Sequence, residues 1–189
     1  MKSKKIIFSG NPFIGLSAFT VLVCFWVALT CTFVSAEGAS TVTIKWSSDK
    51  RFSDNGDKTI TDTKTGLMWL KEDAYLHTGH WMNWEEVFVY VDKLNHEGFA
   101  GYHDWLVPST EELLTLFDPD KFNSAQVGRE MNIRIDPIFA KNGSGAHWST
   151  KTNGHHNAFG VIYNDGMVFS SSKNSRARKS VRAVRYINP

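Results

Sequence analysis

Cysteine is scarce in this chain of 189 residues, and its two cysteines, Cys24 and Cys31, both precede residue 37. The rest of the sequence therefore offers no disulfide, no thiol nucleophile and no thiolate metal site. About 150 residues suffice to bury one self-sufficient core without such cross-links. We expect one globular domain that is held together by its core alone.

Charge is also scarce near the N-terminus, where an apolar run separates a basic start from a small-residue end. Lys2, Lys4 and Lys5 precede the apolar residues 13–34, and the segment ends Val34-Ser35-Ala36. This order is typical of a secretory signal peptide over residues 1–36 that is cleaved after Ala36. The run approaches the roughly 20 residues that span a bilayer, so an uncleaved N-terminal anchor is the alternative. Both interpretations predict an exported domain, periplasmic or extracellular, which the anchor would hold at the inner membrane.

Acidic residues are absent after Asp165, although the whole chain has 19 of them against 21 lysines and arginines. Three of the basic residues and none of the acidic ones precede Glu37, so the mature domain is close to neutral. No general attraction to nucleic acid follows from such a balance. The acid-free end is nevertheless a local positive patch. Its cations are Lys173, Arg176, Arg178, Lys179, Arg182 and Arg185.

Internal repeats are missing as well, and short strand-like runs alternate with turns. Residues 37–48 are a linker or a first strand, and the domain proper covers residues 49–187. Turns at Asn55-Gly56 and at residues 63–66 precede the run 67–70, which predicts a hairpin. A second hairpin is expected from residues 158–163 and 167–169. A last strand is expected over residues 181–187.

Two helices are predicted by their start signals. Asn83 with Glu86, and Ser109 with Glu112, each have the spacing of a capping box before apolar residues at helical intervals. The stretch 118–145 is rich in turn residues and is expected to be mostly loop. Two main helices among short antiparallel strands and long loops predict a compact α+β fold.

Four pieces of the sequence carry a family resemblance when they are taken in order. They are Phe52-Ser53-Asp54-Asn55-Gly56-Asp57 with Thr65-Gly66-Leu67-Met68-Trp69, Gly101-Tyr102-His103-Asp104-Trp105 with Pro108 and Glu112-Leu113, Trp148-Ser149-Thr150, and Val181-Arg182-Ala183-Val184-Arg185. Together they resemble the family named for the C-terminal domain of the Legionella collagen-like adhesin, long catalogued as a domain of unknown function. The resemblance covers roughly residues 49–187.

The resemblance implies an exported bacterial domain with a C-type-lectin-like fold. In the adhesin this domain forms trimers and binds sulfated glycosaminoglycans, so a homo-oligomer and a glycan ligand are implied here. Two positions depart from the family pattern. Leu106 stands where an arginine is common, and Ala183 stands where a cysteine is usual.

Metal sites find little support in the sequence. Asp54, Asn55, Asp57 and Asp62 gather oxygen ligands around a glycine turn, as calcium loops do, but their spacing is not that of an EF-hand. Turn chemistry is the favoured interpretation of these residues, and calcium the alternative. His77, His80, His155 and His156 lack the helix motif and the cysteines of zinc sites and are taken as loop histidines. No cofactor is predicted.

The sequence also gives little support for a catalytic motif. Ser109 is better explained as a helix cap than as a nucleophile, and no Gly-x-Ser-x-Gly turn occurs. Asp104 with Glu111 or Glu112 is a candidate carboxylate pair for hydrolysis. A periplasmic hydrolase or metal-dependent enzyme is therefore an alternative to the binding domain described next, which is not an enzyme.

Binding has more support. Arg176, Arg178, Lys179 and Arg182 are clustered cations that suit sulfate or carboxylate groups. Trp81, among polar neighbours, is expected to be exposed and to stack on a sugar. These five residues form the predicted site for an anionic glycan in adhesion or envelope attachment. A solvated loop, or a module that binds another envelope protein, is the alternative.

Overall fold

The fold is built around a five-stranded antiparallel sheet. The structure is a computed structural model that describes residues 44–126, 128 and 130–187; the predicted signal segment lies outside these residues. The sheet has the order β1-β2-β3-β4-β10, so the last strand of the chain pairs with β4. Its strands are β1 (Lys45–Trp46), β2 (Phe52–Asp54), β3 (Thr59–Asp62), β4 (Leu67–Leu70) and β10 (Val184–Tyr186).

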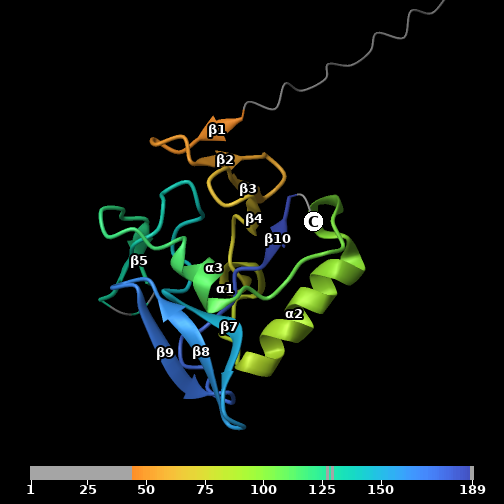
Figure 1. The fold of residues 1–189 in the computed structure, drawn as a ribbon, viewed down its shortest axis with the longest axis vertical. Helices are drawn as coiled ribbons and strands as arrows, with labels where there is room; N and C mark the ends of the chain where they lie inside the picture. Colours follow the sequence, from red (N-terminus) through yellow and green to blue (C-terminus); the bar gives the residue numbers. More distant parts are fainter. Residues whose placement is uncertain (1–43, 127, 129, 188–189) are drawn as a thin grey trace, which may run out of the picture. The chain divides into compact units, whose positions relative to one another are not determined.

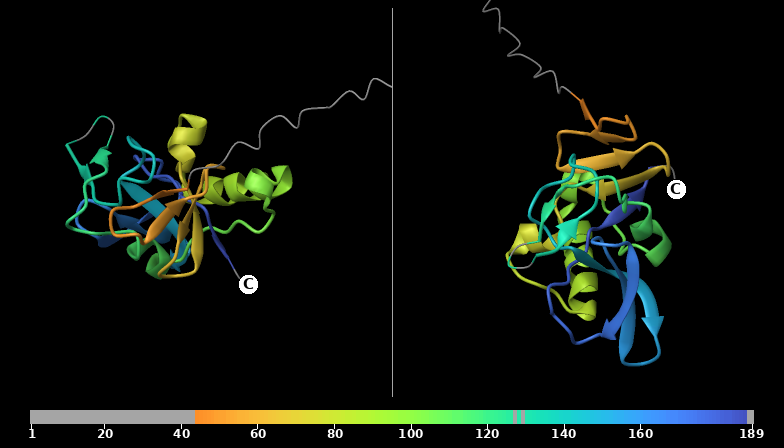
Figure 2. Two further views of the ribbon diagram at one scale, coloured as in Figure 1. Left: turned by 90° about the horizontal axis from the view of Figure 1, so that it is seen from above. Right: turned by 90° about the vertical axis from the view of Figure 1, so that its left-hand side faces the viewer.

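Two smaller antiparallel sheets complete the β structure. The three-stranded sheet has the order β7-β8-β9, and a two-stranded sheet pairs β5 with β6. Strands β1–β3 lie at one end of the domain and the three-stranded sheet at the other (Figures 1 and 2). The strands are β5 (Ser124–Ala125), β6 (Asn132–Ile133), β7 (Ala146–Asn153), β8 (Asn157–Ile162) and β9 (Met167–Ser172).

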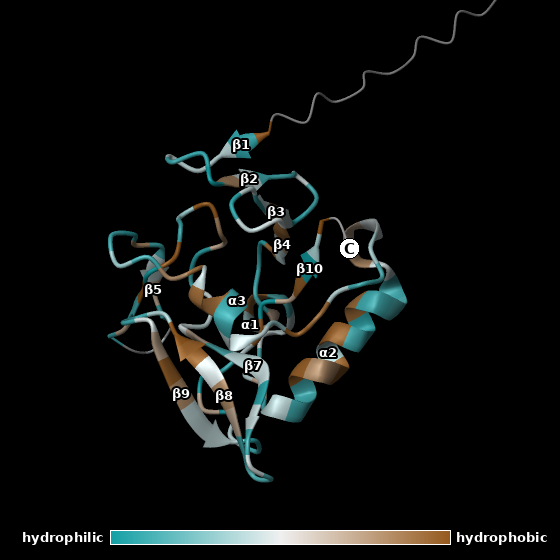
Figure 3. Cartoon of the chain, in the orientation of Figure 1, coloured by the Kyte–Doolittle hydropathy of each residue, from teal (hydrophilic) through white to brown (hydrophobic). Residues whose placement is uncertain are grey.

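The two predicted helices are confirmed. Helix α2 (Trp84–Glu97) begins with the expected capping box between Asn83 and Glu86, and α3 (Thr110–Leu114) begins with the one between Ser109 and Glu112. Both boxes satisfy backbone N–H groups that a helix start leaves without partners. Helix α2 carries both apolar and polar residues along its length, because only one of its faces packs against the core (Figure 3).

Two short helical segments were not predicted. Helix α1 (Ala74–Thr78) is capped by Asp73 and ends at Gly79, whose φ of 78° is left-handed. A single 3₁₀ turn, η1 (Phe99–Gly101), follows α2. Helix α1 is too short to show an apolar period, so sequence patterning had nothing to detect.

The core consists of two clusters of buried side chains. One packs α2 and Trp105 against Met68, Trp148 and Val181. The other packs α3 against Trp69 and the loop that ends at Phe139. The described residues thus form a compact mixed α/β domain with few helices and antiparallel sheets. Among these helices, none is both long and apolar enough to cross a lipid bilayer.

A buried ionic group joins three segments of the chain that are far apart in sequence. Asp73 is fully buried, and its carboxylate accepts hydrogen bonds from Leu76 N–H (3.0 Å), Ser144 N–H (2.5 Å) and His147 Nε2 (3.2 Å). Burial acts to raise the pKa of Asp73, but His147 and the nearby Arg182 charge together lower it. Burial lowers the pKa of His147, so the imidazole is neutral and donates to an ionised carboxylate.

We predict that Asp73→Ala costs about 3–5 kcal/mol of unfolding free energy, as expected when one partner of a buried charged group is removed. His147, two backbone N–H groups and the Arg182 charge would all lose the carboxylate. Urea denaturation measures the change. Asp92→Ala, at an exposed position of α2, is the control and should stay within about 0.5 kcal/mol of the parent chain. An equal response of the two variants would contradict the role given to Asp73.

Candidate functional site

The predicted cations are concentrated in residues 173–179, here called the basic loop, which follows β9. Its two ends are held by backbone hydrogen bonds: Trp84 N–H donates to the Lys173 carbonyl (2.9 Å), and Met82 N–H donates to the Lys179 carbonyl (2.9 Å). Lys173 Nζ also lies 4.6 Å from the centre of the Trp84 ring. The loop therefore lies along the start of α2, beside the segment that contains Trp81.

Arg176 is exposed but already paired. Its guanidinium donates from Nε and Nη2 to both carboxylate oxygens of Glu86, the capping-box residue of α2. The hydrogen bond from Arg176 is the main cause that lowers the pKa of Glu86. Arg176 is thus engaged with the protein, and an anion would have to compete with Glu86 for it.

Lys179 is buried without an acidic partner among the described residues. Its Nζ donates to Ser175 Oγ (2.9 Å) and lies 5.2 Å from the Trp148 ring centre and 5.5 Å from the Phe169 ring centre. Burial lowers the pKa of Lys179. A hydroxyl and two ring faces compensate an ammonium only in part, so this group favours a nearby anion.

Arg178 and Lys179 line a cavity of about 300 Å³ between the basic loop and the strands β8 and β9. Arg178 has a φ of 53°, in the left-handed region. None of the described residues that line the cavity is acidic, and Gln126 adds a nitrogen-bearing side chain to those of Arg178 and Lys179. Its apolar wall consists of Met131, Ala146, Ile162 and Phe169.

Phe169 owes its place in this wall to Gly160. The two residues face each other across the β8–β9 pairing, and a Cβ on Gly160 would lie 2.5 Å from the Phe169 ring and 2.2 Å from the His147 carbonyl oxygen. Both distances are far below van der Waals contact, so the glycine makes room for the ring. The ring in turn packs edge-on against Trp148, with ring centres 5.2 Å apart.

Arg182, a predicted ligand, does not reach the surface. It is 1% exposed, and its Nη1 donates to the carbonyls of Leu70 (2.7 Å) and Lys71 (2.6 Å). Its guanidinium also lies 4.9 Å from the centre of the Phe139 ring. The prediction of a surface cation at this position was therefore wrong, because the last segment of the chain enters the core here.

Trp81 is half-buried rather than open to solvent. Its ring stacks on Tyr75 with centres 3.7 Å apart and planes 6° from parallel. One face is therefore used by Tyr75. Trp46 on β1 is the more exposed tryptophan, at 48%. Since Met82 is hydrogen-bonded to Lys179, Trp81 does lie beside the basic loop, as a glycan platform there would require.

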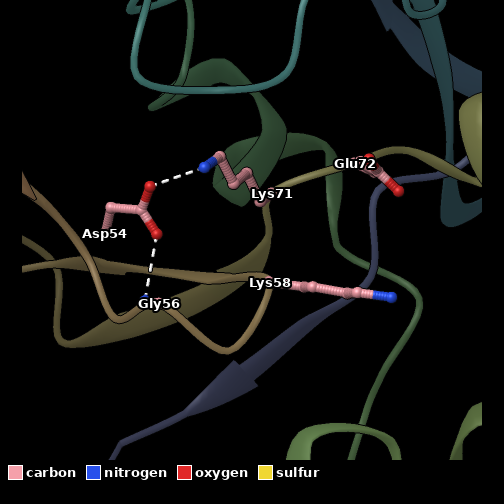
Figure 4. A pocket seen from close by; sticks show the side chains of 5 residues that line it. All are labelled: Asp54, Gly56, Lys58, Lys71 and Glu72. Carbon is pink, nitrogen blue, oxygen red and sulfur yellow. Dashed lines mark hydrogen bonds and ion pairs between the residues drawn. The ribbon is translucent and has the colours of Figure 1, made fainter. Parts of the chain in front are cut away.

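The calcium candidates do not converge on one point. Asp54 accepts from Lys71 Nζ (2.6 Å) and from Gly56 N–H (3.1 Å), and Figure 4 shows both groups aimed at its carboxylate while Lys58 and Glu72 point away. Asp62 is bound by the guanidinium of Arg51 at 2.6 and 3.0 Å. The ammonium and guanidinium stand where a cation would bind, which fits the favoured turn interpretation.

Asp57 and Asn55, the two remaining calcium candidates, also form hydrogen bonds within the protein. Asp57 accepts from the N–H and the hydroxyl of Thr59, and the Asn55 amide donates to Thr59 and Thr61. Within the described ranges, no group of three or more acidic, histidine or cysteine side chains is placed to hold a metal ion. Asp54, Asn55 and Asp57 build the turn between β2 and β3, whereas Asp62 ends β3 and accepts from Lys64 N–H in the turn that follows.

Asp104 and Glu112, from the candidate carboxylate pair, also accept hydrogen bonds from other groups of the protein. Asp104 accepts from Arg185 at 2.7 and 3.0 Å, and the hydrogen bond from Arg185 lowers its pKa. Glu112 accepts from Ser109 N–H (2.7 Å) and the Tyr186 hydroxyl (2.7 Å). A general acid needs a raised pKa, whereas Asp104 shifts in the opposite direction.

Gln126 and Phe169 are the members of this site that the sequence did not indicate. Gln126 lies in the stretch expected to be loop, and Phe169 was interpreted only as a strand residue. Neither carries a local motif. Their partners in the cavity are Lys179 and Arg178, which only the fold brings close to them.

We predict that millimolar calcium leaves the melting temperature of the parent chain unchanged, because Lys71 and Arg51 already neutralise Asp54 and Asp62. Thermal denaturation with calcium and with a chelator measures this. The comparison variant Lys71→Met vacates the Asp54 carboxylate and should be the more sensitive of the two. A calcium-dependent rise in the parent chain of several degrees would restore the calcium interpretation.

Comparison with known protein families matches residues 58–185 to the Lcl C-terminal domain, which is the family that the four sequence pieces resemble. The match covers well over half of the chain and includes the whole basic loop. Among curated proteins, no match is found.

Proposed function

Since the chain belongs to the Lcl C-terminal domain family, we propose that it is an exported, non-enzymatic binding domain that recognises anionic glycans through its basic loop. One observation carries this proposal: of the described residues, Arg178 and Lys179 line a cavity to which no acidic side chain contributes, and Lys179 is buried there without a counter-ion. An anionic ligand would supply the missing charge.

The chemistry of the site favours binding over catalysis. The described side chains that line the cavity include cations, an amide, two serines and an apolar wall, and none of them is a carboxylate, a histidine or a tyrosine. General acid–base catalysis by a carboxylate or an imidazole has no group to use there. Recognition of a sulfate or carboxylate needs only the donors that are present.

We also propose a C-type-lectin-like arrangement for this domain. The return of β10 to pair with β4 supports it, since the first and last strands of the described region share one sheet. The two main helices fall between them in sequence, as does the long-loop region of residues 118–145. Trimer formation, as the family resemblance implies, belongs to the same proposal.

We predict that the double variant Arg178→Gln with Lys179→Met binds heparin at least about a hundredfold more weakly than the parent chain. Each lost charge-assisted hydrogen bond is worth about 1.5–3 kcal/mol, and about 1.4 kcal/mol corresponds to a factor of ten. Methionine preserves the apolar stem of Lys179 against Trp148 and Phe169. Binding to immobilised heparin at several salt concentrations measures the change.

The matched control is Lys64→Met with Lys93→Gln, which removes the same charge from exposed positions outside the basic loop. It should shift binding little, and Arg176→Gln should do less than the double variant because Glu86 already holds Arg176. Unchanged heparin binding by the double variant, or an equal loss in the control, would refute the proposed site.

Export is tested separately. We predict that the chain expressed in a bacterium is recovered outside the cytoplasm with Glu37 as its first residue, as cleavage after Ala36 requires. Cell fractionation followed by N-terminal sequencing measures both. An intact N-terminus in the membrane fraction would favour the anchor, and intact protein in the cytoplasm would contradict export.

A further inference from the structure

The edge strand β1 exposes a tryptophan that the core does not cover. Trp46 is 48% exposed and Ile44, just before β1, is 54% exposed, whereas the other tryptophans of the described residues are buried or half-buried. Strand β1 stands at the end of the five-stranded sheet, next to β2. Large apolar side chains that are exposed together mark a surface for a partner.

Trp46 borders two hollows of the surface. One, of about 460 Å³, is lined by Trp46, Lys50 and Thr63. The other, of about 190 Å³, is lined by Trp46, Lys45 and residues 47–48 and 136–138. A lysine therefore shares each hollow with the tryptophan.

The charges around Trp46 are compensated unequally, because several nearby acids already have cationic partners. These ion pairs join Asp49 and Asp136 to Lys121, Asp54 to Lys71, and Asp62 to Arg51. Lys45 and Lys50 are exposed and form no ion pair with any acidic residue that the structure describes. The charge that is left for a partner beside Trp46 is therefore positive.

An exposed tryptophan between lysines suits the surface of a lipid bilayer. The indole ring has an apolar body and a polar N–H, so tryptophan is enriched where the acyl chains meet the headgroups. Lysine ammonium groups are attracted by anionic headgroups within about a Debye length of the bilayer. A bilayer with anionic lipids therefore matches both the apolar and the charged part of this surface.

The segment that precedes β1 in the sequence supports the same partner. The apolar run ends at Val34, and residues 35–43 connect it to the described domain. When fully extended, such a connection spans at most roughly 30 Å. An uncleaved anchor would therefore keep β1 within reach of the bilayer. One weak membrane signal gives reversible binding, and a second signal makes the attachment stable.

We propose that Ile44, Lys45, Trp46 and Lys50, here called the β1 patch, dock the domain on a lipid bilayer that contains anionic headgroups. This inference is independent of the proposed glycan site, because none of these residues belongs to the basic loop. Strands β1–β3 lie at one end of the domain, and the three-stranded sheet, along which the basic loop runs, lies at the other (Figures 1 and 2). Docking through the β1 patch directs the basic loop away from the membrane.

Quenching of tryptophan fluorescence by phospholipids with brominated acyl chains tests the proposal, because bromine quenches only rings that are close to it. The purified chain and Trp46→Phe are each mixed with vesicles, or reconstituted into them if the anchor is retained. The vesicles consist of phosphatidylcholine alone or of phosphatidylcholine with phosphatidylglycerol. The difference between the two proteins is the quenching of Trp46, since their other tryptophans are the same. We expect this difference with phosphatidylglycerol and its loss without it.

Charge variants assign the contact to the β1 patch. Lys45→Gln with Lys50→Gln should lose most of the Trp46 quenching, because two attractions to the anionic surface are removed. The control, Lys93→Gln with Lys151→Gln, removes the same charge from α2 and β7 and should be quenched like the parent chain. All four lysines are exposed, so each double variant should fold as the parent chain does.

Three outcomes would overturn the inference and leave the heparin test of the proposed function unaffected. The first is equal quenching of the parent chain and Trp46→Phe in vesicles with phosphatidylglycerol. The second is Trp46 quenching that does not depend on phosphatidylglycerol, which would rule out the anionic headgroup as the partner. The third is a loss of quenching in Arg178→Gln with Lys179→Met but not in the β1 variant, since the membrane contact would then lie at the basic loop.

Discussion

The buried carboxylate of Asp73 is the constraint on which the rest of the structure depends. An ionised group with no exposure must find its donors inside the protein, and Asp73 finds them in α1, at Ser144 and on β7. Arg182, equally buried, contributes the opposite charge nearby and donates to the carbonyls that follow β4. These groups connect three regions that are far apart in the sequence, so the packing of each region depends on the others.

The same constraint decides which cations of the C-terminal segment have partners within the protein. Arg182 is buried in the core, the residues before it lie along the three-stranded sheet, and Arg185 after it donates to Asp104. Arg176 is held by Glu86. Arg178 and Lys179 remain without acidic partners among the described residues, beside a cavity. A run of like charges thus divides into cations that are paired within the protein and cations that line the cavity, and only the cations of the cavity support the proposed glycan site.

Much of the fold was predictable, but little of the site was. Capping boxes, turn residues and alternating apolar residues act over a few positions, so the α2 and α3 starts and the β8–β9 hairpin were read correctly. The site combines Gln126 with Phe169, which follows it by more than forty residues, and with Lys179, which follows Phe169 by ten residues. No local pattern marks Gln126, because its place beside the cavity depends on segments that are distant in the sequence.

The sequence by itself determined the α+β class, the family and the concentration of positive charge near the C-terminus, since these follow from short motifs and composition. Only the tertiary structure decided which cations are available. Lys179 and Arg182 stand three residues apart with the same formal charge, yet one lines a cavity and the other is enclosed by Phe139 and two carbonyls. The physical reason is burial: the environment that decides whether a charge is satisfied is assembled from distant segments, and sequence patterns do not contain it.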